Sequence, residues 1–213
     1  MKNNHISYNA PSDLATFDEA QPHNSPVRAF LAVKLPLELA ATLHKKAIHR
    51  AGEGHVHDLR WVAPQQQHIT LKFLGNSYPH QLQQLIGNLE NDLADYHTFD
   101  SMTGCFRFFP NGRIPRVLAL EMHSGQELKR LADICERAAV QSGFSAETRS
   151  FRPHVTLGRF KHPQHATHSQ YFNLPSYRMT VGEVVLLESE STSIGTRYKS
   201  LQAFPLLPLA ISA

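Results

Sequence analysis

Two short segments of the chain place a histidine and a threonine two positions apart in a strand-like context. They read HITL, beginning at His68, and HVTL, beginning at His154. Side chains alternate between the two faces of a strand, so His68 and Thr70 point one way and their apolar neighbours the other. The same holds for His154 and Thr156. Each apolar pair would anchor its strand to a core, which leaves an imidazole and a hydroxyl facing whatever lies opposite.

The four-residue pattern is informative because it recurs with its strand context. With 14 histidines in 213 residues, chance gives roughly 0.7 matches to a bare H-x-T. A third copy, at His165 and Thr167, lies in a polar stretch without a strand pattern, and we assign it to chance. Requiring a leucine after the threonine and a strand pattern around it lowers the number of matches expected by chance roughly tenfold. A half-exposed sheet residue is the alternative for either copy alone, but the pair favours catalysis.

The chemistry of these side chains suits a phosphodiester. The ordinary pKa of histidine, ~6.5, lets one imidazole act as a base and another as an acid near neutral pH. Threonine hydroxyls can donate hydrogen bonds to phosphate oxygens on which negative charge develops. The sequence has no H-E-x-x-H and no carboxylate cluster beside either segment, so we expect no metal and no cofactor.

The composition indicates a globular chain without a disulfide framework. It is 41% hydrophobic and 18% charged, and its net charge of +3 permits an anionic partner without demanding one. Cys105 and Cys135 form no C-x-x-C, which makes a structural zinc site or a secreted disulfide scaffold improbable. No signal peptide or membrane span is evident. We expect a cytoplasmic monomer with a loose tail over residues 1–26.

The elements that must position the two segments alternate between strands and helices. We expect helices over 36–51, 79–96 and 124–144, and strands over 27–35, 57–62, 68–75, 99–109, 115–122, 154–160, 178–191 and 198–206. Several strands follow one another too closely for parallel crossovers, which take about a dozen residues. An α+β fold with mixed or antiparallel sheets is therefore favoured. Each half of the chain contains a strand, a helix and an H-x-T-L strand, which suggests a duplication.

The two segments and their surroundings resemble the 2H phosphoesterase superfamily. Within it they are most similar to the bacterial RNA 2′,3′-cyclic phosphodiesterase group, historically called 2′–5′ RNA ligases. The likeness covers residues 28–206 and rests on RAFLAVKLP, LRWVAPQQQHITLKFLG, FRPHVTLGRF and LLESESTSIGTRYKSLQAFPL. It implies a single domain over residues 27–213, with two pseudo-symmetric lobes around a central V-shaped cleft. Each lobe would be a mostly antiparallel sheet with helices packed outside.

The resemblance also implies an activity and a role for each residue. The substrate would be a 2′,3′-cyclic phosphate on an RNA end or a small nucleotide, hydrolysed to a 2′-phosphate. His68 would be the proton donor to the departing O3′, His154 the proton acceptor that activates water, and Thr70 and Thr156 the groups that hold the phosphate. The two histidines of a near-symmetric cleft could exchange duties. Two alternatives stay open, namely joining RNA ends through a 2′–5′ bond and a non-catalytic RNA- or nucleotide-binding module.

Three cations near the segments are candidates for substrate binding. Arg159 could neutralise phosphate, but strict alternation places it on the face away from His154. Lys72 shares the alternation of His68, although a solvated lysine is the commoner outcome. Arg152 could bind RNA, or it could be an ordinary solvated residue of the surface.

Two aromatic residues and one loop complete the candidates. Phe30 could stack on a base, yet a phenylalanine in an apolar strand is usually a core residue. Tyr198 lies in a segment similar to the G-x-x-Y of the family and would border the cleft. The stretch HPQHATHSQ, residues 162–170, could bind metal through its histidines, but a solvated loop is favoured.

Overall fold

A computed structural model of the chain describes residues 25–53, 58–109, 114–162, 175–193 and 195–209. Nearly all of the expected tail and residues 163–170 of the polar stretch lie outside the described residues. No helix in the described ranges is long and apolar enough to cross a membrane. Cys105 and Cys135 are both free thiols, and Cys135 is buried.

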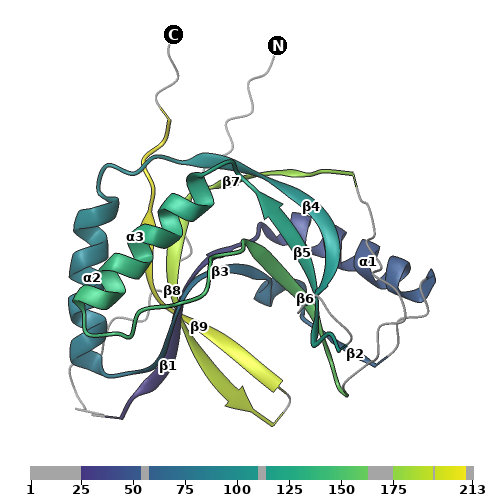
Figure 1. Cartoon of the computed structure of the whole chain (residues 1–213), viewed down its shortest axis with the longest axis horizontal. Coiled ribbons are helices and arrows are strands. Elements are labelled where there is room, and N and C mark those ends of the chain that lie inside the picture. The colour runs from purple at the N-terminus through teal and green to yellow at the C-terminus, as the bar shows by residue number, and fades with distance from the viewer. Residues whose placement is uncertain (1–24, 54–57, 110–113, 163–174, 194, 210–213) are drawn as a thin grey trace, which may run out of the picture.

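The described residues form one sheet and three α-helices (Figure 1). The elements in chain order are β1 (Val27–Lys34), α1 (Leu37–Glu53), β2 (Leu59–Trp61), the 3-10 turn η1 (Pro64–Gln66), β3 (His68–Ser77), α2 (Pro79–Leu93), β4 (Phe99–Phe109), β5 (Val117–His123), α3 (Glu127–Gln141), β6 (His154–Phe160), β7 (Arg178–Val181), β8 (Glu183–Thr192) and β9 (Gly195–Pro205). Every expected helix and strand is present. The segment 178–191, expected as a single strand, is two strands that break at Gly182.

The apolar spacing of the sequence explains the helices. In α2, leucines that recur every three or four residues form one buried stripe, and Pro79 occupies the first turn, where its missing N–H is not needed. The backbone N–H of Tyr78 donates to Oε1 of Gln81 at 3.2 Å and helps to fix the start of this helix. Helices α2 and α3 pack against each other beside the sheet (Figure 1).

The strand order is β7-β4-β5-β6-β3-β1-β8-β9, with β2 paired to β6, and the described strand pairs are antiparallel. The expected α+β class is confirmed. The family resemblance implied one sheet in each lobe, whereas the structure has a single curled sheet that runs through both halves of the molecule (Figure 1). The two H-x-T-L strands, β3 and β6, are neighbours in the middle of this sheet.

The two halves of the sheet repeat one connection. Strands β1 and β3 are antiparallel neighbours joined through α1, and β5 and β6 are antiparallel neighbours joined through α3. The halves meet where Ile69 of β3 pairs with Val155 of β6, the one register pair between these strands. We call this contact the seam. The expected order of strand, helix and H-x-T-L strand in each half is therefore confirmed.

The core lies between the sheet and its helices. Ile69, Leu71, Val155 and Leu157 are all buried in it, as the alternation of the two segments predicted. The sheet face that carries the histidines and threonines of the two segments is called the cleft face below. A smaller apolar cluster lies on it, formed by residues that β1 and β8 contribute, with Tyr198 packed against them.

Candidate active site

Strand β3 contains a bulge directly after its H-x-T residues. Thr70 pairs with Ala32 of β1. The next pair joins Lys72 to Leu31, which leaves Leu71 as an extra residue. The bulge reverses the alternation of side chains for Lys72 and Phe73, before a second irregularity at Leu74.

Strand β6 has the same bulge at the equivalent position. Thr156 pairs with Ala119 of β5, and the next pair joins Gly158 to Leu118, so that Leu157 is the extra residue. Both strands thus change phase one residue after the threonine.

The two bulges overturn the expectations for Lys72 and Arg159. Lys72 is only 4% exposed and lies on the core side, where its Nζ is 2.8 Å from Oε2 of Glu136 and donates to the carbonyl of Ser145 at 2.7 Å. It does not line the cleft. Arg159 pairs with Val117, on the same face of β5 as the partner of Thr156, and therefore points to the cleft face. Its charge also lowers the pKa of His68, which places it near that ring.

The seam brings the four H-x-T residues together. Because Ile69 pairs with Val155 in antiparallel register, Thr70 lies beside His154 and Thr156 lies beside His68. The positive charge of His154 is close enough to lower the pKa of His68. Two imidazoles and two hydroxyls from distant parts of the chain therefore converge on one region of the cleft face.

The same backbone contact orients both imidazoles. Nδ1 of His68 lies 2.7 Å from the carbonyl oxygen of Gln66, and Nδ1 of His154 lies 2.7 Å from that of Arg152. A carbonyl oxygen can only accept, so each Nδ1 carries the hydrogen and donates it. Nε2 of each ring is then left to take or give a proton. Arg152 thus contributes its carbonyl to the site, while its side chain is exposed.

The surroundings of His68 favour its neutral form. Burial is the main cause that lowers its pKa to about 4, and the charges of Arg159, His154 and Lys34 lower it further. The hydrogen bond to Gln66 opposes this effect. In the unliganded site, His68 is therefore neutral at pH 7, and a bound anion would raise its pKa.

Aromatic residues account for much of this burial. The rings of Phe30 and Tyr198 have centroids 4.9 and 5.1 Å from that of His68. Phe30 is only 4% exposed, so the packing alternative holds for it and its ring is not open to a base. Phe73, which sequence reasoning missed, lies opposite Phe30 on the cleft face and is 63% exposed. Phe109 stacks on His154 at 5.5 Å.

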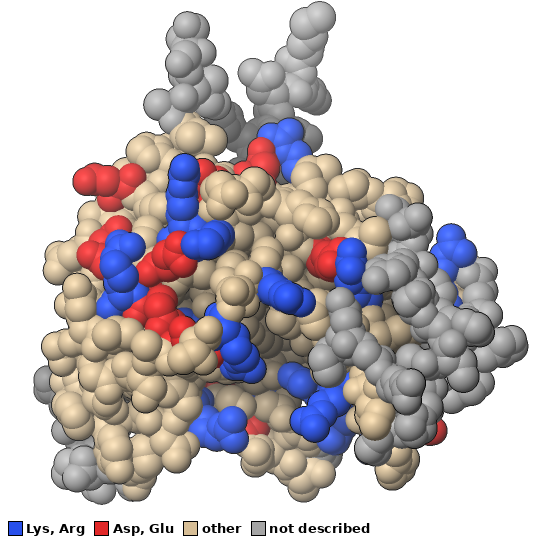
Figure 2. Space-filling model, in the orientation of Figure 1, with Lys and Arg blue, Asp and Glu red and all other residues tan. Residues whose placement is uncertain are grey.

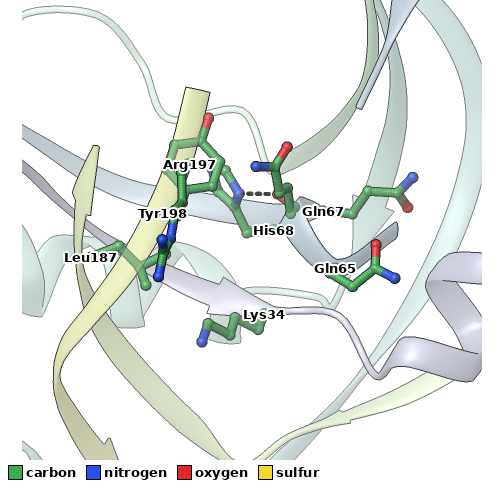
Figure 3. Close-up of a pocket in the computed structure, with 8 residues that line it drawn as sticks. Lys34, Gln65, Gln67, His68, Leu187, Arg197 and Tyr198 are labelled. Carbon is green, nitrogen blue, oxygen red and sulfur yellow. Dashed lines mark hydrogen bonds between the residues drawn. The ribbon is translucent and has the colours of Figure 1, made fainter. Parts of the chain in front are cut away.

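A cavity of ≈ 240 Å³ opens beside His68 (Figure 3). It is lined by Lys34, Gln65, Gln66, Gln67, His68, Leu187, Arg197 and Tyr198. The expectation that Tyr198 borders the site agrees with this placement. Lys34 and Arg197 were not predicted, although both lie in segments that carried the family resemblance. Their proximity to His68 depends on strand register, which the sequence does not reveal.

The charges around the site are mainly positive. Figure 2 shows Lys and Arg side chains around the hollowed middle of the molecule, whereas Asp and Glu gather mostly toward the upper left. In the ranges that the structure describes, no group of three or more His, Cys, Asp or Glu is placed to hold a metal ion.

Comparison with known proteins extends over both H-x-T-L strands. The family model described as the 2′-5′ RNA ligase superfamily matches residues 35–192. An RNA 2′,3′-cyclic phosphodiesterase of Methanothermobacter thermautotrophicus is 30% identical over 84% of this chain and 99% of its own length. One of Bacillus subtilis is 34% identical over 61% of this chain and 69% of its own.

Solved structures show the same arrangement of elements. The crystal structure of E. coli LigT in its apo form superposes with a TM-score of 0.69 and 27% identity, over 86% of this chain and 99% of that one. The same E. coli protein has been crystallised with 3′-AMP, at 27% identity, and with NADP+, at 26% identity.

Proposed function

The chain belongs to the 2′-5′ RNA ligase superfamily and, within it, to the RNA 2′,3′-cyclic phosphodiesterase family; from this premise we propose that it hydrolyses RNA 2′,3′-cyclic phosphate ends to 2′-phosphates. One observation carries the proposal. Two imidazoles, each fixed through Nδ1 by the carbonyl two residues earlier, converge across the seam with a threonine beside each. We also propose that the two halves of the sheet act as pseudo-symmetric lobes, with the V-shaped cleft between them.

The proposed reaction is a single in-line displacement at phosphorus. Nε2 of His154 takes a proton from water as the water oxygen bonds to phosphorus. The bond from phosphorus to O3′ breaks, and Nε2 of His68 gives its proton to that oxygen, which leaves the phosphate on O2′. The hydroxyls of Thr70 and Thr156 donate to the non-bridging oxygens, and Arg159 offsets their charge. Each positioned acid or base contributes on the order of 10²–10⁴-fold.

The low pKa of His68 couples its protonation to substrate binding. A donor must hold a proton, yet the pKa of His68 is about 4 in the unliganded site. The negative charge of a phosphodiester bound beside the ring favours the imidazolium and raises that pKa. His68 therefore gains its proton together with the substrate, which suits it to donate only when a phosphate is present.

Hydrolysis in excess chelator tests the proposal directly. We expect a dinucleotide with a 2′,3′-cyclic end to give a 2′-phosphate by phosphorus NMR, with turnover unaffected by chelator. His68→Ala and His154→Ala should each lower kcat by about 10²–10⁴-fold. The exposed His80, changed to alanine, is the matched control and should retain activity.

Other outcomes identify the alternatives. A 3′-phosphate product or chelator-sensitive turnover would contradict the mechanism. Nucleotide binding that survives both histidine changes, without product, would indicate a non-catalytic module. A joined product from a cyclic-phosphate end and a 5′-hydroxyl end would indicate 2′–5′ ligation, which the same acid and base can catalyse in reverse.

A sulfur-substituted substrate assigns the order of the two histidines. When O3′ is replaced by sulfur, the leaving thiolate needs no proton, because a thiol is a far stronger acid than an alcohol. We expect this substrate to restore activity to His68→Ala and not to His154→Ala. Restoration of His154→Ala instead would exchange the two roles.

A further inference from the structure

The cavity beside His68 lies on the side of that residue away from the seam. Strand β3 has β6 as one neighbour and β1 as the other. The lining residues come from β1, η1 and its flanks, β8 and β9, and none comes from β6. A phosphorus atom that both imidazoles reach must lie at the seam. The cavity is therefore a second compartment next to the reacting group.

This compartment is lined by two cations, while one carboxylate, that of Glu190 on β8, lies opposite Arg197 in the sheet without lining the cavity. Lys34 lies directly opposite His68 in the sheet, and Arg197 comes from the edge strand β9. No acidic residue lines the cavity. The ammonium of Lys34 donates to Oγ of Ser200 at 2.7 Å, and within the described part of the chain no carboxylate forms an ion pair with Lys34 or Arg197. Two cations in a small recess favour an anion.

We propose that Lys34 and Arg197 bind the phosphate on the 5′ side of the terminal nucleotide, so that the protein selects RNA ends over cyclic mononucleotides. The inference rests on the proposed function. An RNA end carries a second phosphate one ribose away from the cyclic phosphate, whereas a cyclic mononucleotide carries none. The volume of ≈ 240 Å³ is below the ~300 Å³ of the smallest typical ligand sites, which suits a phosphate with part of its ribose.

Arg197 is the residue on which to test the subsite. Lys34 also lowers the pKa of His68, so its removal would alter the proposed acid as well as the subsite. Arg197 is not among the charges that shift that pKa. Lys199 provides a matched control, because it is an exposed cation two residues further along β9 and does not line the cavity.

The experiment compares kcat/KM for three substrates. They are adenosine 2′,3′-cyclic phosphate, its 5′-phosphorylated form, and a dinucleotide with the same cyclic end. We expect the second and third to exceed the first by about tenfold, the effect of one charge-assisted hydrogen bond at a partly exposed site. In Arg197→Ala this ratio should fall toward one, whereas Lys199→Ala should keep it.

Salt dependence provides a second readout that a loss of folding would not mimic. In the wild type, the preference for the dinucleotide should decline with salt, with a log–log slope steeper by about 0.7 than for the mononucleotide. Arg197→Ala should lose that difference in slope.

A preference near one in the wild type, or an unchanged preference in Arg197→Ala, would overturn the inference. Failure to hydrolyse any of the three substrates would refute the proposed function instead. In that case calorimetry with the 2′-phosphate forms of the dinucleotide and the mononucleotide tests the subsite. The dinucleotide should bind more tightly in the wild type and in Lys199→Ala, and this preference should be lost in Arg197→Ala.

Discussion

At the scale of single residues, two imidazoles with identical backbone contacts have different neighbours. Lys34 lies opposite His68, whereas Glu121, which forms an ion pair with Arg107, lies opposite His154. His68 packs against two aromatic rings, those of Phe30 and Tyr198, whereas His154 is stacked by Phe109. The local sequence fixes the tautomer of both rings, but the charge and burial around each depend on strands far away in the chain.

The pKa of His68 should therefore respond to ligand. By NMR of the imidazole nitrogens, we expect a titration near pH 4 in the free protein, with the hydrogen on Nδ1 above that pH. Adding adenosine 2′-phosphate should raise this pKa, because the anion stabilises the imidazolium. A free-protein titration near the ordinary value of ~6.5 would contradict the burial described above.

The same group makes stability depend on pH. The folded pKa of about 4 lies below the ~6.5 of an unfolded histidine, so the unfolded state binds the proton first as the pH falls. The contribution of His68 is present above pH ~6.5 and is lost by pH ~4. Between pH ~6.5 and pH ~4, the free energy of unfolding measured in urea should fall by up to about 3 kcal/mol more in the wild type than in His68→Gln. Parallel pH curves for the two proteins would contradict this linkage.

At the scale of elements, the bulges after Thr70 and Thr156 determine which side chains reach the cleft. The bulge in β3 turns Lys72 into the core, where it joins β3 to Glu136 on α3 and to the carbonyl of Ser145. Oε1 of Glu136 also accepts from the backbone N–H of Glu147, at 2.8 Å. This contact fixes part of the segment that leads to β6.

Removing Glu136 from its ion pair with Lys72 should lower the stability of the protein more than removing Lys72. Glu136→Ala leaves a buried ammonium without its counter-ion and should lower the free energy of unfolding by about 3 kcal/mol. Lys72→Met fills the same space, and the carboxylate of Glu136, which is partly exposed, can turn to water, so we expect a loss of about 1 kcal/mol.

Chemical denaturation measures both effects. Lys129→Met is the control, because it removes an exposed pair with Asp133 and should change stability by less than about 0.5 kcal/mol. A larger loss in Lys72→Met than in Glu136→Ala would contradict the expected order.

The elements also show how far the sequence predicts this molecule. The spacing of leucines predicted α2, and the alternation of His68 to Leu71 predicted which residues enter the core, because both depend only on local geometry. The faces of Lys72 and Arg159 could not be predicted, since each bulge depends on how two separate strands align. Lys34 and Arg197 were missed for the same reason.

At the scale of the whole molecule, the two halves of the sheet meet through a narrow contact. Strands β3 and β6 share one register pair, whereas β1 and β3 pair along most of their length. A ligand that contacts both histidines would bridge this seam. Binding energy is then linked to the association of the two halves as well as to the local site.

Ligand binding should accordingly stabilise both halves together. At about 100 times its Kd, adenosine 2′-phosphate should add about 2.7 kcal/mol to the free energy of unfolding. Hydrogen exchange should slow in β3 and in β6, and His154→Ala should lose the added protection in β6. Protection confined to one half in the wild type would contradict binding across the seam.

The repeated bulge also determines how distant relatives of this chain are best recognised. In a regular strand, the residues two and four positions after a histidine share its face; here the positions are two and five, occupied by Thr70 and Phe73 in one half and by Thr156 and Arg159 in the other. A search template spaced in this way compares cleft-lining residues with one another. A homologue that lacks one residue at this point would present a differently lined cleft despite an unaltered H-x-T-L.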